Sequence, residues 1–137
     1  MLDTCILVAA IRAPAGASAR LLAGVFERKI LVLASTSMLL EYEAVMTREE
    51  HRKVSGLSGT EIDVLLDSYA KFALPIEVFF SWRPFLRDPG DNMVLDAATN
   101  GQADAIVTFN HRDFEGVYDR FGIEIVSPKE VCRRIWP

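Results

Sequence analysis

The chain has 137 residues, of which 50% are hydrophobic and 25% are charged, a composition typical of one globular domain and not of a disordered chain. Its formal net charge of −4 argues against a general polyanion-binding protein, so contact with nucleic acid needs a local basic patch or bound cations. The two cysteines show no CxxC spacing, and no secretory signal or apolar run of roughly 20 residues is present, which predicts a cytoplasmic protein that does not contact a membrane.

Short apolar runs alternate with segments of helical spacing along the chain. An apolar strand opens at Met1 and passes almost at once, at Asp3, into an apolar helix. Further strands are predicted at 30–35, 75–86, 104–109 and 123–127. Further helices are predicted within 13–29, 38–53, 56–74, 88–101 and 128–136, with Ser37, Thr60 and Asp88 as N-caps of the second, third and fourth of these.

This alternation predicts the α/β class, in which helices cover both faces of a parallel sheet. Ligand sites of such sheets lie beyond the carboxyl ends of the strands. The position of each acidic residue relative to its strand therefore decides whether it can join a site.

Asp3 and Asp91 are placed at that edge. Asp3 follows the first strand, where an N-cap role and a site role are equally compatible with the sequence. Asp88, Pro89 and Asp91 have the spacing of the N-cap, the first and the third position of a helix. Apolar residues three, four and seven positions after Asp91 place it at the top of the stripe that packs on the sheet, which favours a site role.

The remaining aspartates divide between the two edges. Asp96 is rotated by about 140° from Asp91 around the helix and is predicted to be solvated. Asp104 begins a strand about 20 Å long and therefore lies at the wrong edge. Asn110 and Asp113 follow that strand and fall at the site edge.

Glu41 and Glu43 lie near the start of the helix predicted at 38–53, beside the same apolar face. Periodicity does not separate them, and either is compatible with a solvated surface acid. A glutamate from this helix together with Asp3, Asp91 and Asp113 would gather four acids at one edge.

Such a gathering of like charges raises the pKa of its members. A hard divalent cation with oxygen ligands, Mg²⁺ or Mn²⁺, is the simplest compensation. A carboxylate-bound metal suits the hydrolysis of a phosphodiester, because it polarises the phosphate and lowers the pKa of a bound water.

The chain resembles the PIN-domain family, and most of all the bacterial toxin components of VapC type, through five segments in order: "LDTCILVAAI", "LLEYEAVM", "RDPGDNMVLDAA", "ADAIVTFNHRDF" and "SPKEV". The resemblance implies a single PIN domain over residues 1–137, with a three-layer α/β/α, Rossmann-like fold and a mostly parallel sheet of four or five strands. It also implies an endoribonuclease that depends on Mg²⁺ or Mn²⁺ and hydrolyses RNA phosphodiesters, leaving a 5′-phosphate. A homodimer and a cognate antitoxin protein are the partners implied besides the RNA substrate.

The resemblance assigns the site residues individually. It selects Glu41 over Glu43 as the residue that orients or deprotonates the attacking water. Its catalytic residues are Asp3, Glu41, Asp91 and Asp113, its supporting residues are Thr108 and Asn110, and its metal ligands are Asp3, Asp91 and Asp113.

Two positions depart from the family pattern. Cys5 stands where the family often has an asparagine that orients the first acid, and Asn110 stands where many members have an aspartate. Both departures favour an alternative, a catalytically weak or inactive PIN-fold binding module. A phosphatase of the haloacid-dehalogenase type ranks lower, because it needs an aspartate where Cys5 stands.

Arginines and aromatics outside these motifs are open to two interpretations each. Four arginines are either phosphate contacts or solvated charges: Arg12, Arg48, Arg87 and Arg112. Five aromatics are expected mostly in the core, with a partner surface as the less common alternative: Phe79, Phe80, Trp82, Phe85 and Trp136.

Overall fold

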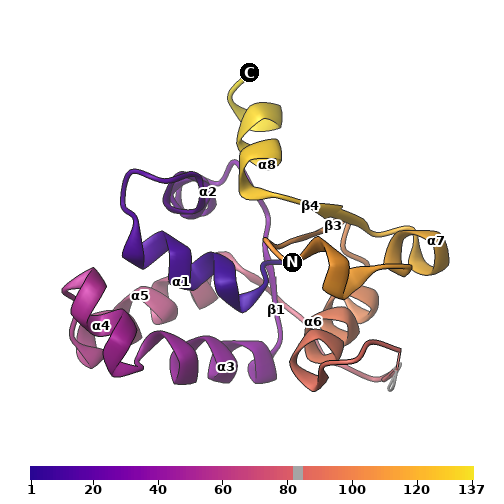
Figure 1. Ribbon diagram of the computed structural model, residues 1–137, viewed down its shortest axis with the longest axis horizontal. Coiled ribbons are helices and arrows are strands. Elements are labelled where there is room, and N and C mark those ends of the chain that lie inside the picture. Colours follow the sequence, from indigo (N-terminus) through magenta and orange to yellow (C-terminus); the bar gives the residue numbers. More distant parts are fainter. Residues whose placement is uncertain (82–84) are drawn as a thin grey trace.

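The computed structural model describes residues 1–81 and 85–137. Its α-helices are α1 (Thr4–Arg12), α2 (Ala17–Phe26), α3 (Thr36–Met46), α4 (Glu49–Ser55), α5 (Gly59–Phe72), α6 (Pro89–Asn100), α7 (Val117–Phe121) and α8 (Pro128–Ile135), with a 3₁₀ helix η1 at His111–Phe114. Figure 1 shows α1 to α5 on one side of β1, and α6, α7, β3 and β4 on the other.

The strands are short, and they pair in parallel. β1 (Leu33–Ala34) pairs with β2 (Leu74–Pro75), and β3 (Ala105–Val107) pairs with β4 (Glu124–Val126). The α/β class and the parallel pairing are therefore confirmed. The hydrogen bonds between the described residues form two separate pairs, however, and not the continuous sheet of four or five strands that the sequence led us to expect.

The first three residues extend the pair of β3 and β4 by a parallel bridge between Leu2 and Val107. The backbone N–H of Asp3 donates to Val107 O at 3.0 Å, and Val107 N–H donates to Met1 O at 2.9 Å. The buried Tyr42 hydroxyl of α3 donates to Leu2 O at 2.5 Å. Asp3 is thereby fixed beside the carboxyl end of β3.

The strand expected at 75–86 is reduced to β2. Pro75 has no N–H for a further ladder bond, which limits extension of the strand. Backbone bonds from Leu74 N–H to Val32 O and from Ile76 N–H to Ala34 O hold β2 to β1. Residues 82–84 of the expected strand lie outside the described residues.

Two predicted helix caps are wrong by two residues. Ser35, not Ser37, is the N-cap of α3, and its Oγ accepts the Met38 N–H at 3.1 Å. Ser58, not Thr60, is the N-cap of α5, where it forms a reciprocal capping box with the third helical residue. The spacing of a serine and a glutamate three residues apart was the stronger signal at α5.

The helix expected at 38–53 is broken into α3 and α4. Thr47 Oγ1 donates to Glu43 O at 2.7 Å at the end of α3. Arg48 then takes a non-helical backbone conformation, with φ of −58° and ψ of 141°, before α4 starts. The break turns α4 back across α1, with which it is in contact.

The described aromatic residues between β2 and α6 are not mostly buried. Phe79 is 76% exposed and Phe80 is 69% exposed, which contradicts the expectation of a core cluster. Phe85 and Trp136 are partly buried, and the Phe85 ring packs edge-on against Phe121. Trp82 lies outside the described residues.

The first two helices, α1 and α2, are rich in apolar residues. In the part of the chain that the structure describes, no single helix combines the length and the apolar character needed to cross a bilayer. α1 and α2 reach that length only together, and they are bent by 103° relative to each other.

Candidate active site

Asp3 acts both as a helix cap and as a buried acid. It is only 7% exposed, and its Oδ1 accepts the Thr4 N–H at 2.8 Å at the start of α1. Its Oδ2 accepts the Thr108 hydroxyl at 2.7 Å. The N-cap reading of Asp3 is thus confirmed, and the same carboxylate is buried with its orientation fixed by two donors.

Thr108 connects Asp3 to the loop after β3. The side chain is fully buried, and its Oγ1 also accepts the Asn110 N–H at 3.0 Å. The exposed Asn110 and Asp113 follow, with Asp113 inside η1. The buried Thr108 hydroxyl therefore bonds both to Asp3 and to the backbone turn that leads to Asp113.

Cys5 provides a further contact to Asp3. Its thiol donates to Asp3 Oδ2 at 3.5 Å and lies 3.8 Å from Thr108 Oγ1. Burial, followed by the nearby Asp3 carboxylate, raises the pKa of Cys5 to about 11. Cys5 is thus a half-buried neutral thiol, and Thr108 is the hydroxyl that orients the first acid.

Asp91 lies in the first turn of α6, three residues after the N-cap Asp88, whose Oδ1 accepts the Gly90 N–H at 2.6 Å. Partial burial raises the pKa of Asp91 from its ordinary value of 3.8 to about 6, with further increases from the charges of Asp3, Asp88 and Asp113. Segments that are far apart in the sequence therefore bring their carboxylates within electrostatic range of one another. We refer to Asp3, Asp88, Asp91 and Asp113 as the acidic cluster.

Glu41 lies on α3, outside this cluster. It is half-buried, whereas Glu43 is exposed. Glu41 borders a groove that also contains Thr4 and Cys5, the two residues after Asp3. Glu41 therefore shares this groove with the residues that follow Asp3, and it is not among the charges that shift the pKa of Asp91.

The acidic cluster offers carboxylate oxygens, which are the donor type that hard divalent cations prefer. No cation is among the causes that shift the pKa of Asp91. Within 1–81 and 85–137, no three His, Cys, Asp or Glu side chains are close enough to hold an ion as they stand. Asp91 and Asp113 make no side-chain hydrogen bond to another described residue, whereas the Asp3 carboxylate is held by the Thr4 N–H and the Thr108 hydroxyl.

Asp96 is not solvated, which corrects the sequence prediction. Asp96 is 4% exposed, and its Oδ2 accepts the Ser81 hydroxyl at 3.1 Å. Asn92 is 3% exposed and bonds to both backbone groups of Leu86, at 2.8 and 3.0 Å. The polar face of α6 therefore binds the segment before it instead of water.

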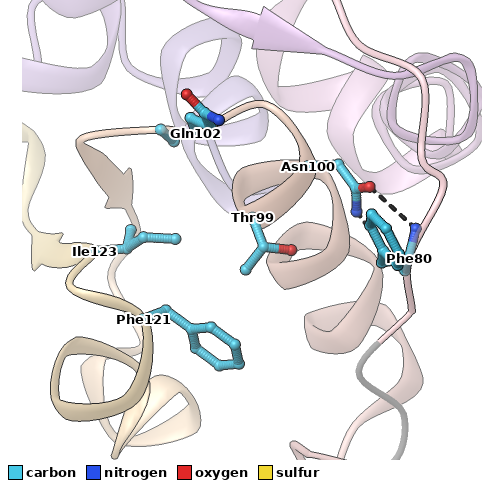
Figure 2. Close-up of a pocket in the computed structure, with 7 residues that line it drawn as sticks. Phe80, Thr99, Asn100, Gln102, Phe121 and Ile123 are labelled. Atoms are coloured by element: carbon cyan, nitrogen blue, oxygen red, sulfur yellow. Dashed lines mark hydrogen bonds between the residues drawn. The ribbon is translucent and has the colours of Figure 1, made fainter.

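Asn100 completes this polar face at the other end of α6. Its Oδ1 accepts the N–H groups of Phe79 and Phe80 at 2.9 and 3.0 Å, and its Nδ2 donates to Phe80 O at 2.8 Å. Figure 2 shows Asn100 and Phe80 at the edge of a pocket that also contains Phe121 and Ile123. Asp91 is about 13 Å away along the helix, so this pocket is separate from the acidic cluster.

Sequence reasoning missed two contributions to the site. Asp88 was read as a helix cap only, although its charge also raises the pKa of Asp91; its place three residues before Asp91, on the adjacent helix turn, was the available signal. The thiol of Cys5 was not expected to bond to Asp3, and no sequence pattern signals that contact.

Comparison with known proteins gives one match. A family model described as the PIN domain matches residues 1–112. This span contains Asp3, Glu41, Asp91 and Asn110 and ends one residue before Asp113. Neither the curated proteins nor the solved structures gave a match. With its acidic cluster at the carboxyl end of parallel strands and a family match over most of its length, the chain belongs to the PIN-domain family.

Proposed function

We propose that this protein is an endoribonuclease that depends on Mg²⁺ or Mn²⁺ and hydrolyses RNA phosphodiesters. PIN domains are in general metal-dependent nucleases. The observation that carries the proposal is the pKa of Asp91, raised to about 6 by burial and by the other three acids of the cluster. Acids that repel one another in this way, without a cationic partner among the described side chains, are suited to a divalent cation.

The proposed roles are those that the family resemblance assigns. Asp3, Asp91 and Asp113 would hold the metal, which when bound supplies charge to polarise the phosphate and a lowered pKa for water. Thr108 keeps the Asp3 carboxylate in one orientation through its 2.7 Å hydrogen bond. Glu41, which lines the same groove as Thr4 and Cys5, would accept the proton of the attacking water.

The test is cleavage of single-stranded RNA in Mn²⁺ by wild type, by Asp91→Asn and by a matched control, Asp104→Asn. Asp104 is exposed at the opposite end of β3. We expect Asp91→Asn to lower kcat/KM by at least roughly 100-fold, Asp104→Asn to match wild type, and the products to carry 5′-phosphates. Full activity in Asp91→Asn would refute the assignment.

A second candidate function is a non-catalytic PIN-fold binding module. One observation in its favour is that no three acidic, histidine or cysteine side chains are close enough to hold an ion anywhere in the described ranges. Another is that Cys5 and Asn110 differ from the residues that the family usually has at these positions. Calorimetric titration with Mn²⁺ separates the two candidates. Saturable binding that Asp91→Asn abolishes supports the nuclease, whereas no binding supports the module.

We further propose that the protein is the toxin of a toxin–antitoxin pair, works as a homodimer, and is covered by a cognate antitoxin. The resemblance to VapC-type toxins in five ordered segments supports this proposal. Expression of wild type should arrest bacterial growth, and expression of Asp91→Asn should not. Equal growth with the two proteins, at equal levels of soluble protein, would argue against a toxin.

A further inference from the structure

An open groove of about 620 Å³ lies next to the acidic cluster, between α1, α3, α4 and the residue after Thr108. Its floor is apolar and is formed by residues such as Val8, Ala9 and Val45. At one end lie Cys5 and Phe109, which are adjacent to the site residues. The volume is in the range of ligand-binding clefts.

Phe109 is an exposed aromatic ring at the edge of this groove. Its side chain is 53% exposed, although its neighbour Thr108 is fully buried and bonded to Asp3. Consecutive Cα atoms are only about 3.8 Å apart, so the ring is tied to the residue that orients the first acid. An exposed phenylalanine gains nothing from solvent, and its flat face is available to stack on a planar ligand.

The other end of the groove is cationic. Arg12 Nη1 donates to His51 Nδ1 at 2.9 Å. Because a guanidinium can only donate, His51 Nδ1 must accept, and the histidine holds Arg12 against α4. Arg48 also lines the groove, and its guanidinium has no hydrogen-bond or ion-pair partner within 1–81 and 85–137.

The charge balance of the groove differs from that of the whole chain. The residues that line the groove include two arginines and the single acid Glu41, whereas the whole chain carries a formal net charge of −4. A stacking ring, an apolar floor and two guanidinium groups are the features that bind one nucleotide of a single-stranded nucleic acid.

We propose that this groove is a nucleotide subsite, in which Phe109 stacks on a base of the single-stranded RNA substrate while Arg12 and Arg48 contact its phosphates. The subsite rests on the proposed nuclease function and specifies its substrate as unpaired RNA. A base in the groove would lie directly beside the acidic cluster, so the adjoining phosphodiester is the one presented for cleavage.

The kinetic test compares Phe109→Ala with Phe109→Tyr, which keeps a ring, and with Tyr118→Ala as a matched control. Tyr118 is 61% exposed and does not line the groove. Loss of one stacked base should raise KM for a short unpaired RNA roughly tenfold with kcat within about twofold. Phe109→Tyr and Tyr118→Ala should stay near wild type. An unchanged KM in Phe109→Ala, or a loss confined to kcat, would overturn the subsite.

The arginines are tested by salt dependence. Arg48→Gln should weaken binding of a fluorescently labelled eight-nucleotide RNA and reduce the salt slope of binding by about 1, as expected for one lost phosphate contact. Measured in EDTA, this binding does not depend on cleavage. If the protein cleaves no RNA but its RNA binding still requires Phe109, the proposed nuclease function is refuted while the proposed nucleotide subsite stands.

The same assay separates a nucleotide subsite from a surface for acidic proteins. Polyglutamate serves as the competing polyanion without bases. If it displaces the RNA as well as unlabelled RNA does, and Phe109→Ala binds RNA like wild type, the groove is a general anion surface and the proposal fails. Weak competition by polyglutamate together with a strong effect of Phe109→Ala supports it.

Discussion

Replacement of Asp91 by asparagine should stabilise the metal-free protein while it destroys the site. Folding raises the pKa of Asp91 from 3.8 to about 6, and each pH unit between these values corresponds to 1.36 kcal/mol. Asp91 is only partly buried, so solvent screening reduces the penalty of its charged form to roughly 1 kcal/mol.

The sign of the pH dependence follows from proton binding. Between about pH 4 and pH 6 the folded protein holds the Asp91 proton more tightly than the unfolded chain does, so the stability contributed by this group falls as pH rises. Above about pH 6 the full penalty is present. Asp91→Asn removes the penalty, so the variant should equal wild type near pH 4 and exceed it by about 1 kcal/mol above pH 7.

The assay is thermal unfolding in EDTA at pH 4.5 and pH 7.5, with Asp104→Asn as the control. We expect Asp91→Asn to raise Tm by roughly 3–5 °C at pH 7.5 and hardly at all at pH 4.5. Added Mn²⁺ should then stabilise wild type and not the variant, because only the intact cluster binds the ion in the folded state. A variant less stable than wild type at pH 7.5, or equally stabilised at both pH values, would refute the reasoning.

Three further predictions concern individual contacts. Thr108→Val should lower the free energy of unfolding in urea by about 2 kcal/mol and lower activity, because Asp3 loses a buried hydrogen-bond donor. Thr108→Ser keeps the hydroxyl and should retain most of the stability and the activity. Equal losses in the two variants would contradict this reasoning. Asn92→Ala should cost about 2–3 kcal/mol, because it leaves the buried backbone groups of Leu86 unpaired; a loss below 0.5 kcal/mol would show that water replaces the amide. Cys5 should react with iodoacetamide at pH 8 only about a thousandth as fast as a full thiolate, as followed by mass spectrometry, and rapid alkylation of the folded protein would count against its raised pKa.

The order of strands and helices could be predicted from the sequence because local patterns encode it. Apolar runs marked β1, β3 and β4, and Asp88 with Pro89 marked the start of α6. The extent of the strands could not be predicted, because apolar runs continue into residues that pack against helices without ladder hydrogen bonds. The break at Arg48 was also not predictable, since no proline or glycine marks it.

The candidate site could be predicted as far as the strand-edge rule reaches. That rule predicted Asp3, Asp91 and Asp113 at one edge of the sheet, and the charges of Asp3 and Asp113 do raise the pKa of Asp91. No three of these acids are close enough to hold an ion in the described ranges. The burial of Asp96 was missed because its polar neighbours on α6 resembled a solvated face. These polar side chains of α6 bind the segment before the helix, and the spacing of residues along a helix does not reveal what packs against that helix.

Three of the four acids of the cluster lie at the amino ends of helices, with Asp3 capping α1 and Asp88 and Asp91 at the start of α6. Each amino end carries roughly half a positive charge, which comes from backbone N–H groups and not from any side chain. This fixed field makes it easier to gather carboxylates without arginines, and it leaves their outer sides open to a cation. A variant that lacks two of these carboxylates would keep the positive field of the helix amino ends, so the emptied site would then favour an anion.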